Sequence, residues 1–289
     1  RWGESVAARI GRAWVSSGHR GQREGALRAI SASLGTVSAF AVFAGLLVLA
    51  VWSFAGYWGF PDALPNSFTL KNWMRHSSGV SSSLQDTFVI AILATSLALI
   101  LTIGCLEAEY RYGLTVSSRG LWLLFIPLLV PQTAFLPGIQ TLFLGFGAES
   151  GRLPVIFAHL VFVLPYVFLS LSEPFRAWDY RLGVTGAALG ASPDRVLWRL
   201  RLPMLLQPVL TACAIGIAVS VGQYLPTLLI GGGRVTTLTT EALALASGGD
   251  RRAIAVYGLA QTAAALLPFL AAIAIPTLVW RNRLGVRHG

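Results

Sequence analysis

Long apolar runs that contain no charged residue restrict how this chain can fold more than any other feature of its sequence. Residues 29–54 and 205–230, for example, contain no Asp, Glu, Lys or Arg. About 20 such residues in a helix cross the hydrocarbon core of a bilayer. We therefore predict an all-α membrane protein with six transmembrane helices, at residues 29–54, 88–106, 120–143, 153–172, 205–230 and 254–280.

The composition supports a membrane protein over a nucleic-acid-binding one. The chain is 55% hydrophobic and 12% charged, whereas soluble domains carry about a quarter charged residues. A net charge of +10 would suggest nucleic acid in a soluble protein. Here the basic residues flank the apolar runs, where they orient spanning helices. We expect a lipid bilayer as the surrounding partner and no nucleic acid.

The distribution of basic residues predicts which side of the membrane each loop faces. With six alternating spans, the two tails and the loops 107–119 and 173–204 hold 16 of the 22 Lys and Arg residues. Segments 55–87, 144–152 and 231–253 hold the other six. Because cytoplasmic loops are enriched in Lys and Arg, we expect both termini and the 173–204 loop in the cytoplasm, and 231–253 outside.

The predicted spans divide the chain into one transmembrane domain and two short tails. In residues 1–28, Trp2, Val6, Ile10 and Trp14 recur at helical spacing, which predicts an amphipathic helix on the membrane surface. The same basic stretch would also suit a linker within a longer, fused protein, and no signal-peptide pattern opens it. Residues 29–280 form the transmembrane domain and 281–289 a cytoplasmic tail.

The loop between the fourth and fifth spans has the sequence of two short helices joined at a turn. Gly190 suits a position of positive φ, Ser192 is a good N-cap and Pro193 fits the first helical turn. The second helix then combines apolar residues with the basic residues Arg195, Arg199 and Arg201. From these residues alone, a solvated amphipathic loop is as plausible as a docking element.

This loop resembles the EAA signature of the permeases of binding-protein-dependent ABC importers. That signature is Glu-Ala-Ala, three residues, Gly, nine residues, an aliphatic residue, any residue, and Leu-Pro. Gly190, Leu200 and Leu202-Pro203 match it, whereas Val184-Thr185-Gly186 replace Glu-Ala-Ala. Residues 83–87 (Ser-Leu-Gln-Asp-Thr) and 162–166 (Phe-Val-Leu-Pro-Tyr) are also similar to family segments, so the resemblance covers roughly residues 80–280.

The resemblance implies a type I importer fold in the bacterial inner membrane and a set of partners. These are a cytoplasmic ATP-binding subunit present as a dimer, a second permease subunit or half, and a periplasmic or extracellular solute-binding protein. It also implies that the loop contains a coupling helix for the ATPase. The chain has no Gly-x4-Gly-Lys-Ser/Thr motif, so we expect a transporter subunit and not an enzyme. The coupling residues would be Gly190, Ala191, Ser192, Pro193, Arg195, Trp198, Arg199, Leu200, Leu202 and Pro203.

Polar residues within the spans are candidates for the solute pathway, because burying them in lipid is costly. Hydrogen bonding between helices explains such residues equally well. His159 is expected to be a hydrogen-bonded residue near a helix end, and Glu107, Glu109 and Arg111 a solvated helix end. Cys105 and Cys213 lie in apolar runs and suggest no disulfide, metal or cofactor. The pathway candidates are Gln132, Gln140, Gln223, Tyr224 and Gln261.

Two other functional classes compete with an importer permease. A secondary transporter or channel would be expected to have a duplicated architecture or buried charged relays, and neither is evident. A membrane-embedded enzyme would need a cluster of His, Asp or Glu at the interface. The outer segment 231–253 resembles the iron(III), thiamine, polyamine and sulfate branch of the permeases, with a short helix capped by Thr240. The solute itself is not identified.

Overall fold

The structure, a computed structural model, describes residues 8–9, 11–12, 16, 24–59 and 61–279. The predicted surface helix with Trp2, Val6, Ile10 and Trp14, and the tail 281–289, lie outside the described residues. The chain divides into two compact units, residues 1–48 and 49–289, and we describe each by itself.

In the first unit the regular element is the long helix α2 (Glu24–Phe54), which continues into the second unit. It contains the first predicted span. Three of its hydroxyl side chains bond to its own backbone: those of Ser31, Ser33 and Thr36 donate to carbonyls three or four residues earlier, at 3.1, 3.0 and 2.8 Å. Such bonds remove unsatisfied donors from a helix surface that faces lipid.

The second unit is built from helices, and over the residues described the sole extended pairing is an isolated bridge between Ala55 and Phe68. The prediction of an all-α membrane protein is therefore confirmed. The helices are α3 (Lys71–Tyr112), α4 (Ser118–Leu129), α5 (Gln132–Gly145), α6 (Arg152–Arg176), α7 (Tyr180–Ala188), α8 (Pro193–Val196), α9 (Leu202–Met204), α10 (Leu206–Val221), α11 (Leu225–Gly231), α12 (Leu238–Gly248) and α13 (Arg251–Val279), with a π-helical turn at Leu197–Arg201 between α8 and α9.

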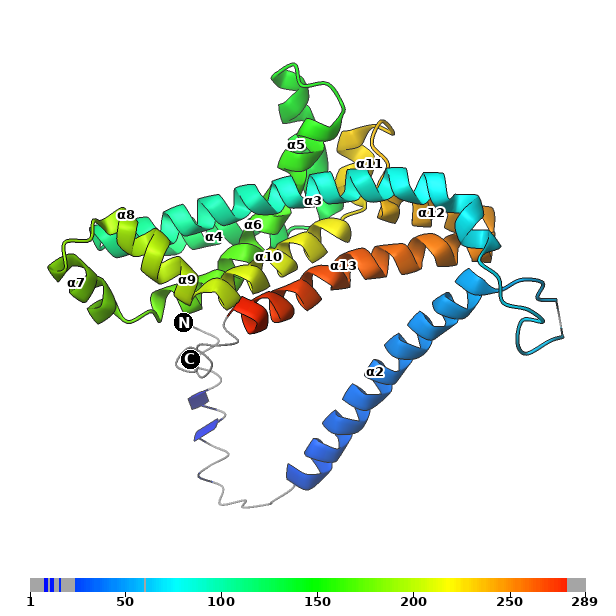
Figure 1. The fold of residues 1–289 in the computed structure, drawn as a ribbon, viewed down its shortest axis with the longest axis horizontal. Coiled ribbons are helices and arrows are strands. Elements are labelled where there is room, and N and C mark those ends of the chain that lie inside the picture. The colour runs from blue at the N-terminus through cyan, green and yellow to red at the C-terminus, as the bar shows by residue number, and fades with distance from the viewer. Residues whose placement is uncertain (1–7, 10, 13–15, 17–23, 60, 280–289) are drawn as a thin grey trace. The chain divides into compact units, whose positions relative to one another are not determined.

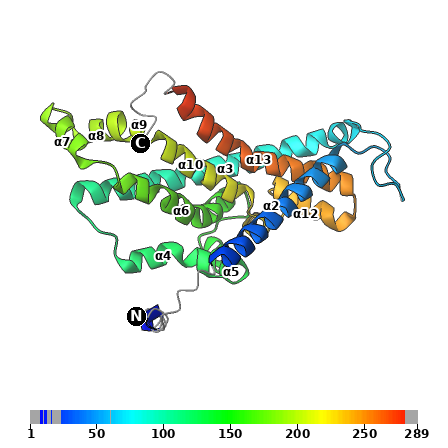
Figure 2. The same ribbon diagram turned by 90° about the horizontal axis from the view of Figure 1, so that it is seen from below.

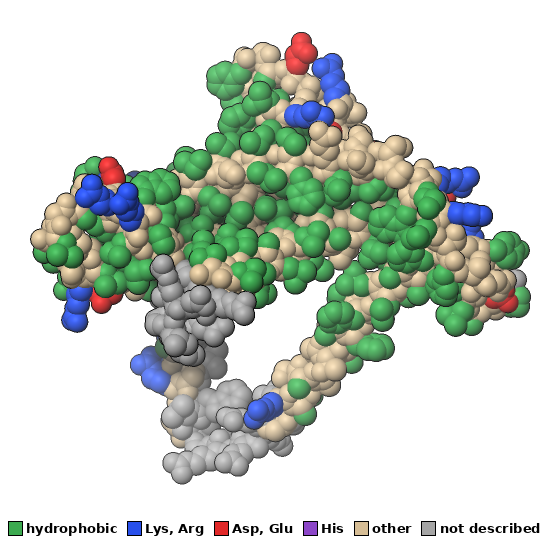
Figure 3. Space-filling view, in the orientation of Figure 1, with side chains coloured by type: hydrophobic (Ala, Val, Ile, Leu, Met, Phe, Trp, Pro, Cys, Tyr) green, Lys and Arg blue, Asp and Glu red, His purple; other side chains and the backbone are tan. Residues whose placement is uncertain are grey.

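Four long helices, α3, α6, α10 and α13, pack lengthwise as a bundle (Figure 1). Helix α4 runs beside α6 on the side away from α13 (Figure 2). Hydrophobic side chains cover the middle of the face in Figure 3, and charged side chains gather at the ends of the bundle and at the tip beyond α5. This apolar band with charged ends is the distribution expected of a membrane-spanning bundle.

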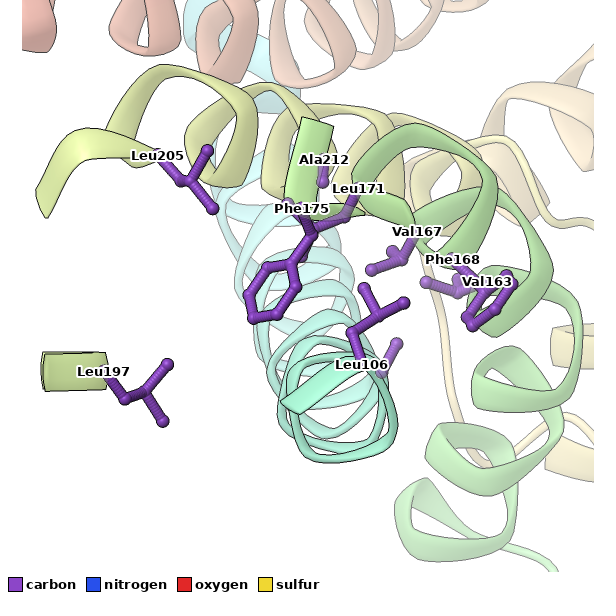
Figure 4. Packing of buried hydrophobic residues seen from close by; sticks show 10 residues of the cluster. Leu106, Val163, Val167, Phe168, Leu171, Phe175, Leu197, Leu205 and Ala212 are labelled. Carbon is purple, nitrogen blue, oxygen red and sulfur yellow. The ribbon is translucent and has the colours of Figure 1, made fainter. Parts of the chain in front are cut away.

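One cluster of buried side chains joins the bundle to the segment after α8. Leu106 of α3 faces Val167, Leu171 and Phe175 of α6 (Figure 4), and Leu197 of the π-helical turn belongs to the same cluster. Within a bilayer such side chains hold helices together through close van der Waals packing. The cluster therefore fixes the end of the bundle that carries α7, α8 and α9.

Four described helices are long and apolar enough to cross a membrane. The number rises to six if each of two bent pairs counts as one span: α4 with α5, and Pro193–Met204 with α10, which meet at 76°. Two of the six predicted spans, 120–143 and 205–230, each consist of two helices and not one. Helices α4 and α5 meet at an angle of 109°, and α10 ends at Val221 before α11 begins at Leu225.

Proline explains both interruptions. Pro131 and Pro226 have no N–H to donate to the carbonyl four residues earlier. Val130, before Pro131, adopts an extended conformation with φ −88° and ψ 131°, as a residue preceding proline prefers. At the second break Gly222 lies four residues before Pro226 and adds flexibility. Pro165, in contrast, lies inside the continuous helix α6.

Candidate functional site

The turn between α7 and α8 is held by backbone bonds that end one helix and a side chain that begins the next. The N–H of Gly190 donates to the carbonyl of Ala187 at 2.9 Å, and that of Ala191 to Gly186 at 3.0 Å. These two bonds form a Schellman motif, which requires a residue of positive φ at its centre. Gly190 has φ +80°, as predicted. Ser192 then caps α8, with its Oγ 3.3 Å from the N–H of Arg195.

Two further glycines allow α7 to pack closely. A Cβ added at Gly186 would lie 3.2 Å from Cγ2 of Val196, and one at Gly183 would lie 2.5 Å from Oη of Tyr110. Gly186 stands at the last position of the Glu-Ala-Ala signature. At this one position of the departure, a Cβ would be in tight contact with Val196, which would have to shift by a few tenths of an ångström.

The residues after Ser192 separate into a buried and an exposed face. Val196 and Leu197 are buried, whereas Arg195 and Arg199 are exposed and Trp198 is 69% exposed. The turn adds Leu189, which is 84% exposed. The loop thus presents two cations and two large apolar side chains to its surroundings, a combination that is frequent in protein interfaces.

The π-helical turn at Leu197–Arg201 places the last arginine of the loop differently from the other two. The N–H of Leu202 donates to the carbonyl of Leu197, five residues earlier, because the ring of Pro203 disturbs the ordinary helical pattern. Arg201 is consequently buried, with 2% exposure. Leu200 and Leu202 are half-buried and Pro203 is exposed.

Arg201 is bound by groups from α3 and α6. Its Nη1 lies 3.0 Å from Oε2 of Glu107, and its Nη2 donates to the carbonyl of Phe175 at 2.7 Å. Its guanidinium also stacks on the rings of Phe175 and Tyr110, with 3.9 and 4.2 Å from Cζ to the ring centroids. Ion pairing, hydrogen bonding and cation–π contact together compensate the burial of this charge.

The expectation that Glu107, Glu109 and Arg111 form a solvated helix end was wrong. Glu107 is buried and lies between Arg201 and Arg111, whose Nε is 2.7 Å from Oε1. Arg111 also reaches Asp194 in α8, at 2.7 Å. Glu109 accepts two bonds from Arg176, at 2.9 and 3.0 Å. These charged residues of α3 therefore form ion pairs with the loop and with α6. Reading along the sequence could not find these pairs, because the partners lie far apart in it.

A cavity of about 470 Å³ lies where both broken helices are interrupted. Of the predicted pathway residues, Gln132 and Gln223 line it together. Gln140 instead donates to the carbonyl of Leu229 at 3.5 Å, and Tyr224 and Gln261 are outside the cavity lining. The full lining is Pro127, Leu128, Val130, Pro131, Gln132, Phe162, Tyr166, Ala218, Val219, Gly222 and Gln223.

His159 forms hydrogen bonds on both sides of the break between α10 and α11. It is buried in α6, with Nδ1 2.8 Å from Oγ of Ser220 in α10 and Nε2 2.9 Å from Oγ1 of Thr227 in α11. The predicted hydrogen-bonded histidine is confirmed, but it lies well within its helix. By bonding to α10 and α11, it holds the two ends at the break in a fixed relation.

Segment 231–253, which was predicted to be external, packs back on the bundle. Thr237 and not Thr240 is the N-cap of α12, and the two threonines form a capping box; the prediction was wrong by one helical turn. The N–H of Leu238 donates to Oγ1 of Thr87 in α3 at 3.0 Å. Gly249 ends α12 in the left-handed conformation, with φ +76°. Among the described residues no group of His, Cys, Asp and Glu could hold a metal ion.

Residues 100–282, which include the loop, both broken helices and α13, match the family described as binding-protein-dependent transport system inner membrane component. The chain belongs to this family. It is accordingly a multi-pass inner membrane protein of a transport system, as the loop motif predicted.

Three relatives are similar to this chain over stretches of different length. The inner membrane ABC transporter permease protein YnjC of Escherichia coli K12 is 34% identical over 207 residues, which are 72% of this chain and 39% of YnjC. The spermidine/putrescine permease PotC of Haemophilus influenzae is 26% identical, over 61% of this chain and 64% of PotC. The putative 2-aminoethylphosphonate permease PhnV of Salmonella typhimurium is 26% identical, over 86% and 90%. The chain spans less than two thirds of the length of the first two.

Proposed function

We propose that this chain is the transmembrane permease subunit of an ABC importer, and that residues 184–203 couple it to a separate ATP-binding subunit. The observation that carries the proposal is the construction of the loop. Its turn is fixed by Gly190 and Ser192, its inner face is anchored by Leu197 and Arg201, and its outer face is left exposed. A solvated connection needs no such anchoring.

Rigid attachment is what coupling requires. Arg201 joins the loop to α3 through Glu107 and to α6 through Phe175, and Asp194 joins it to α3 through Arg111. A force on the exposed face is therefore transmitted to two long helices of the bundle. Closure of an ATPase dimer would in this way move the helices that line the pathway.

The partners follow from the family. The separate ATPase would dock on the exposed face formed by Leu189, Arg195, Trp198 and Arg199. A soluble solute-binding protein would deliver solute from the other side, and a second permease subunit or half would complete the pathway. Placing the loop in the cytoplasm follows from the distribution of Lys and Arg.

The solute class differs between relatives. One is named for spermidine and putrescine, which are polycations, and another for 2-aminoethylphosphonate, which carries an oxyanion. Sequence identity of 26% to each does not favour either class, so the solute must be inferred from the pathway itself.

Two changes in the loop test the coupling role. Gly190→Val forces a β-branched residue into positive φ, at a cost of about 1–2 kcal/mol, and should reduce ATPase retention about tenfold. The double change Arg195→Glu and Arg199→Glu should weaken retention by reversing the charge of the exposed face. The measurements are the amount of ATPase that copurifies with the chain and solute uptake in cells.

Matched variants separate docking from folding. Gly190→Asn tolerates positive φ and should keep most of the ATPase. Arg119→Glu, an exposed charge at the start of α4 outside the loop, should leave retention unchanged. A secondary transporter or channel would keep uptake in all four variants. Full retention and uptake in both loop variants would remove the basis for the proposed function.

A further inference from the structure

The cavity between the two helix breaks has a wall whose hydrogen-bonding groups lack partners. Helices α4 and α10 end at it, and α5 begins at it. Phe162 and Tyr166 of α6 complete the wall. A solute that crosses this apolar bundle needs polar partners on its way. Hydrogen-bonding groups at the cavity wall that lack a partner within the protein therefore require an occupant of the cavity.

The first unpaired groups belong to the start of α5. Ala134 and Phe135 donate to the carbonyl of Pro131, at 3.0 and 3.2 Å. The N–H groups of Gln132 and Thr133 precede these bonds and have no acceptor within the helix. Pro131, the N-cap, makes no side-chain cap. The positive end of a 14-residue helix therefore stands uncapped beside the cavity.

The second unpaired group is independent of the first and comes from the other broken helix. Gln223 lines the cavity and is only 5% exposed. Neither Oε1 nor Nε2 has a hydrogen-bond partner among the described residues. Buried amides are almost always hydrogen-bonded in native proteins. A side chain that lacks partners on both amide atoms at a cavity wall indicates a ligand.

The charge of the wall distinguishes between ligand classes. The cavity lining contains no Asp or Glu, so no carboxylate there would balance the ammonium groups of a polycation. It also contains no Lys or Arg. What it offers is a helix N-terminus and the amides of Gln132 and Gln223, and helix N-termini with nearby N–H donors bind carboxylates and phosphates.

We propose that this cavity is a subsite for the oxyanion group of the transported solute, with Gln223 as a hydrogen-bond donor. The inference rests on the proposed transport function and names its solute class: a small carboxylate or phosphonate, which can also carry an amine, and not a polyamine. Gln223 therefore determines specificity by donating to the anion without holding a charge of its own.

The test uses the purified chain in detergent, with methylphosphonate and putrescine as probes. Binding of methylphosphonate is followed by ³¹P nuclear magnetic resonance line broadening, and binding of putrescine by proton saturation transfer. We expect the chain to bind methylphosphonate and not putrescine. Gln223→Leu should weaken methylphosphonate about tenfold, the effect of losing one bond to a charged acceptor. Gln223→Glu should abolish it and allow putrescine to bind.

The controls separate a ligand role from a structural one. Gln261→Leu removes an amide in α13 that does not line the cavity, and should leave methylphosphonate binding unchanged. Because Gln223 has no partner to lose, Gln223→Leu should not lower the melting temperature. Methylphosphonate binding that Gln223→Leu leaves intact, or a preference for putrescine in the unchanged chain, would overturn the subsite.

A lipid phosphate could supply the same chemistry. Binding is therefore repeated in nanodiscs of phosphatidylcholine with and without phosphatidylglycerol. Unchanged methylphosphonate binding supports a solute site, whereas loss of binding with phosphatidylglycerol identifies a lipid headgroup site and overturns the proposal. ATPase retention by Gln223→Leu is measured in parallel: failure of the subsite with retention intact leaves the coupling function standing.

Discussion

Arg201 lies where the π-helical turn meets α9, and groups from α3 and α6 surround its guanidinium. Replacing it with Met leaves Glu107 buried with Arg111 as its remaining partner. Breaking a buried pair from one side costs about 3 kcal/mol or more. We expect Arg201→Met to lower the melting temperature in detergent and to reduce ATPase retention. Arg199→Met, at an exposed position, should have little effect on stability, and equal melting temperatures for the two variants would contradict the anchoring role.

The same residue marks the limit of sequence reasoning at this scale. Gly190, Ser192 and Pro193 were predicted correctly because turn and cap preferences depend on a few neighbouring residues. Arg195 and Arg199 were assigned to the coupling residues and Arg201 was not, but the burial of Arg201 could not be predicted, since its partner Glu107 is 94 positions away in the sequence. The π-helical turn that reorients Arg201 also has no clear sequence signal.

At the scale of helices, Gly216 sets how closely α10 approaches α3 and α6. A Cβ there would lie 2.6 Å from Cγ2 of Thr95 and 3.0 Å from Cγ2 of Val167. Gly216→Ala should therefore destabilise the bundle by about 1–3 kcal/mol through overpacking. Gly104→Ala is the matched change in α3, because a Cβ there has no neighbour within 4 Å, and it should be neutral or stabilising. Thermal unfolding in one detergent compares them.

The break between α10 and α11 depends on a bridge between helices. His159→Leu would leave the hydroxyls of Ser220 and Thr227 short of a partner, at a cost of about 1–3 kcal/mol. Because the His159–Ser220 contact is shared, the losses in His159→Leu and Ser220→Ala should be less than additive in the double variant. Thr141→Val, whose hydroxyl bonds within α5, serves as the control. Strict additivity would show that the bridge is not a unit.

For the whole molecule, the test of sidedness is labelling from each face of the membrane. Cys105 and Cys213 are first replaced by Ser. With the loop in the cytoplasm, Ser247→Cys in α12 should react with an impermeant maleimide on intact cells, and Ser192→Cys only after permeabilisation. Both positions are exposed, so access and not burial decides the result. Labelling of Ser192→Cys from outside would invert the proposed orientation.

The approximate positions of the spans could be predicted from the sequence, because hydropathy is a property of contiguous residues. The breaks could not, because proline interrupts a helix at Pro131 and Pro226 but not at Pro165, and the difference lies in the surrounding packing. The pathway candidates illustrate the same limit: Gln132 and Gln223 meet at one cavity across two breaks, while Gln140 bonds to a neighbouring helix.

The turn at 189–192 ends α7 with backbone bonds and begins α8 with the Ser192 cap. This construction also affects how fast a partner can bind. The backbone groups of the turn and the Ser192 cap have their hydrogen-bond partners within the loop, so the proposed docking surface would exist before any partner arrives. Ordering a flexible loop on contact would cost roughly 1–2 kcal/mol for each backbone residue fixed. Because the turn at 189–192 is already formed, binding avoids this loss of entropy. A partner then needs only to orient its own surface against that of the loop. Changes to the exposed side chains of the loop can then alter which partner binds, while the turn keeps its shape.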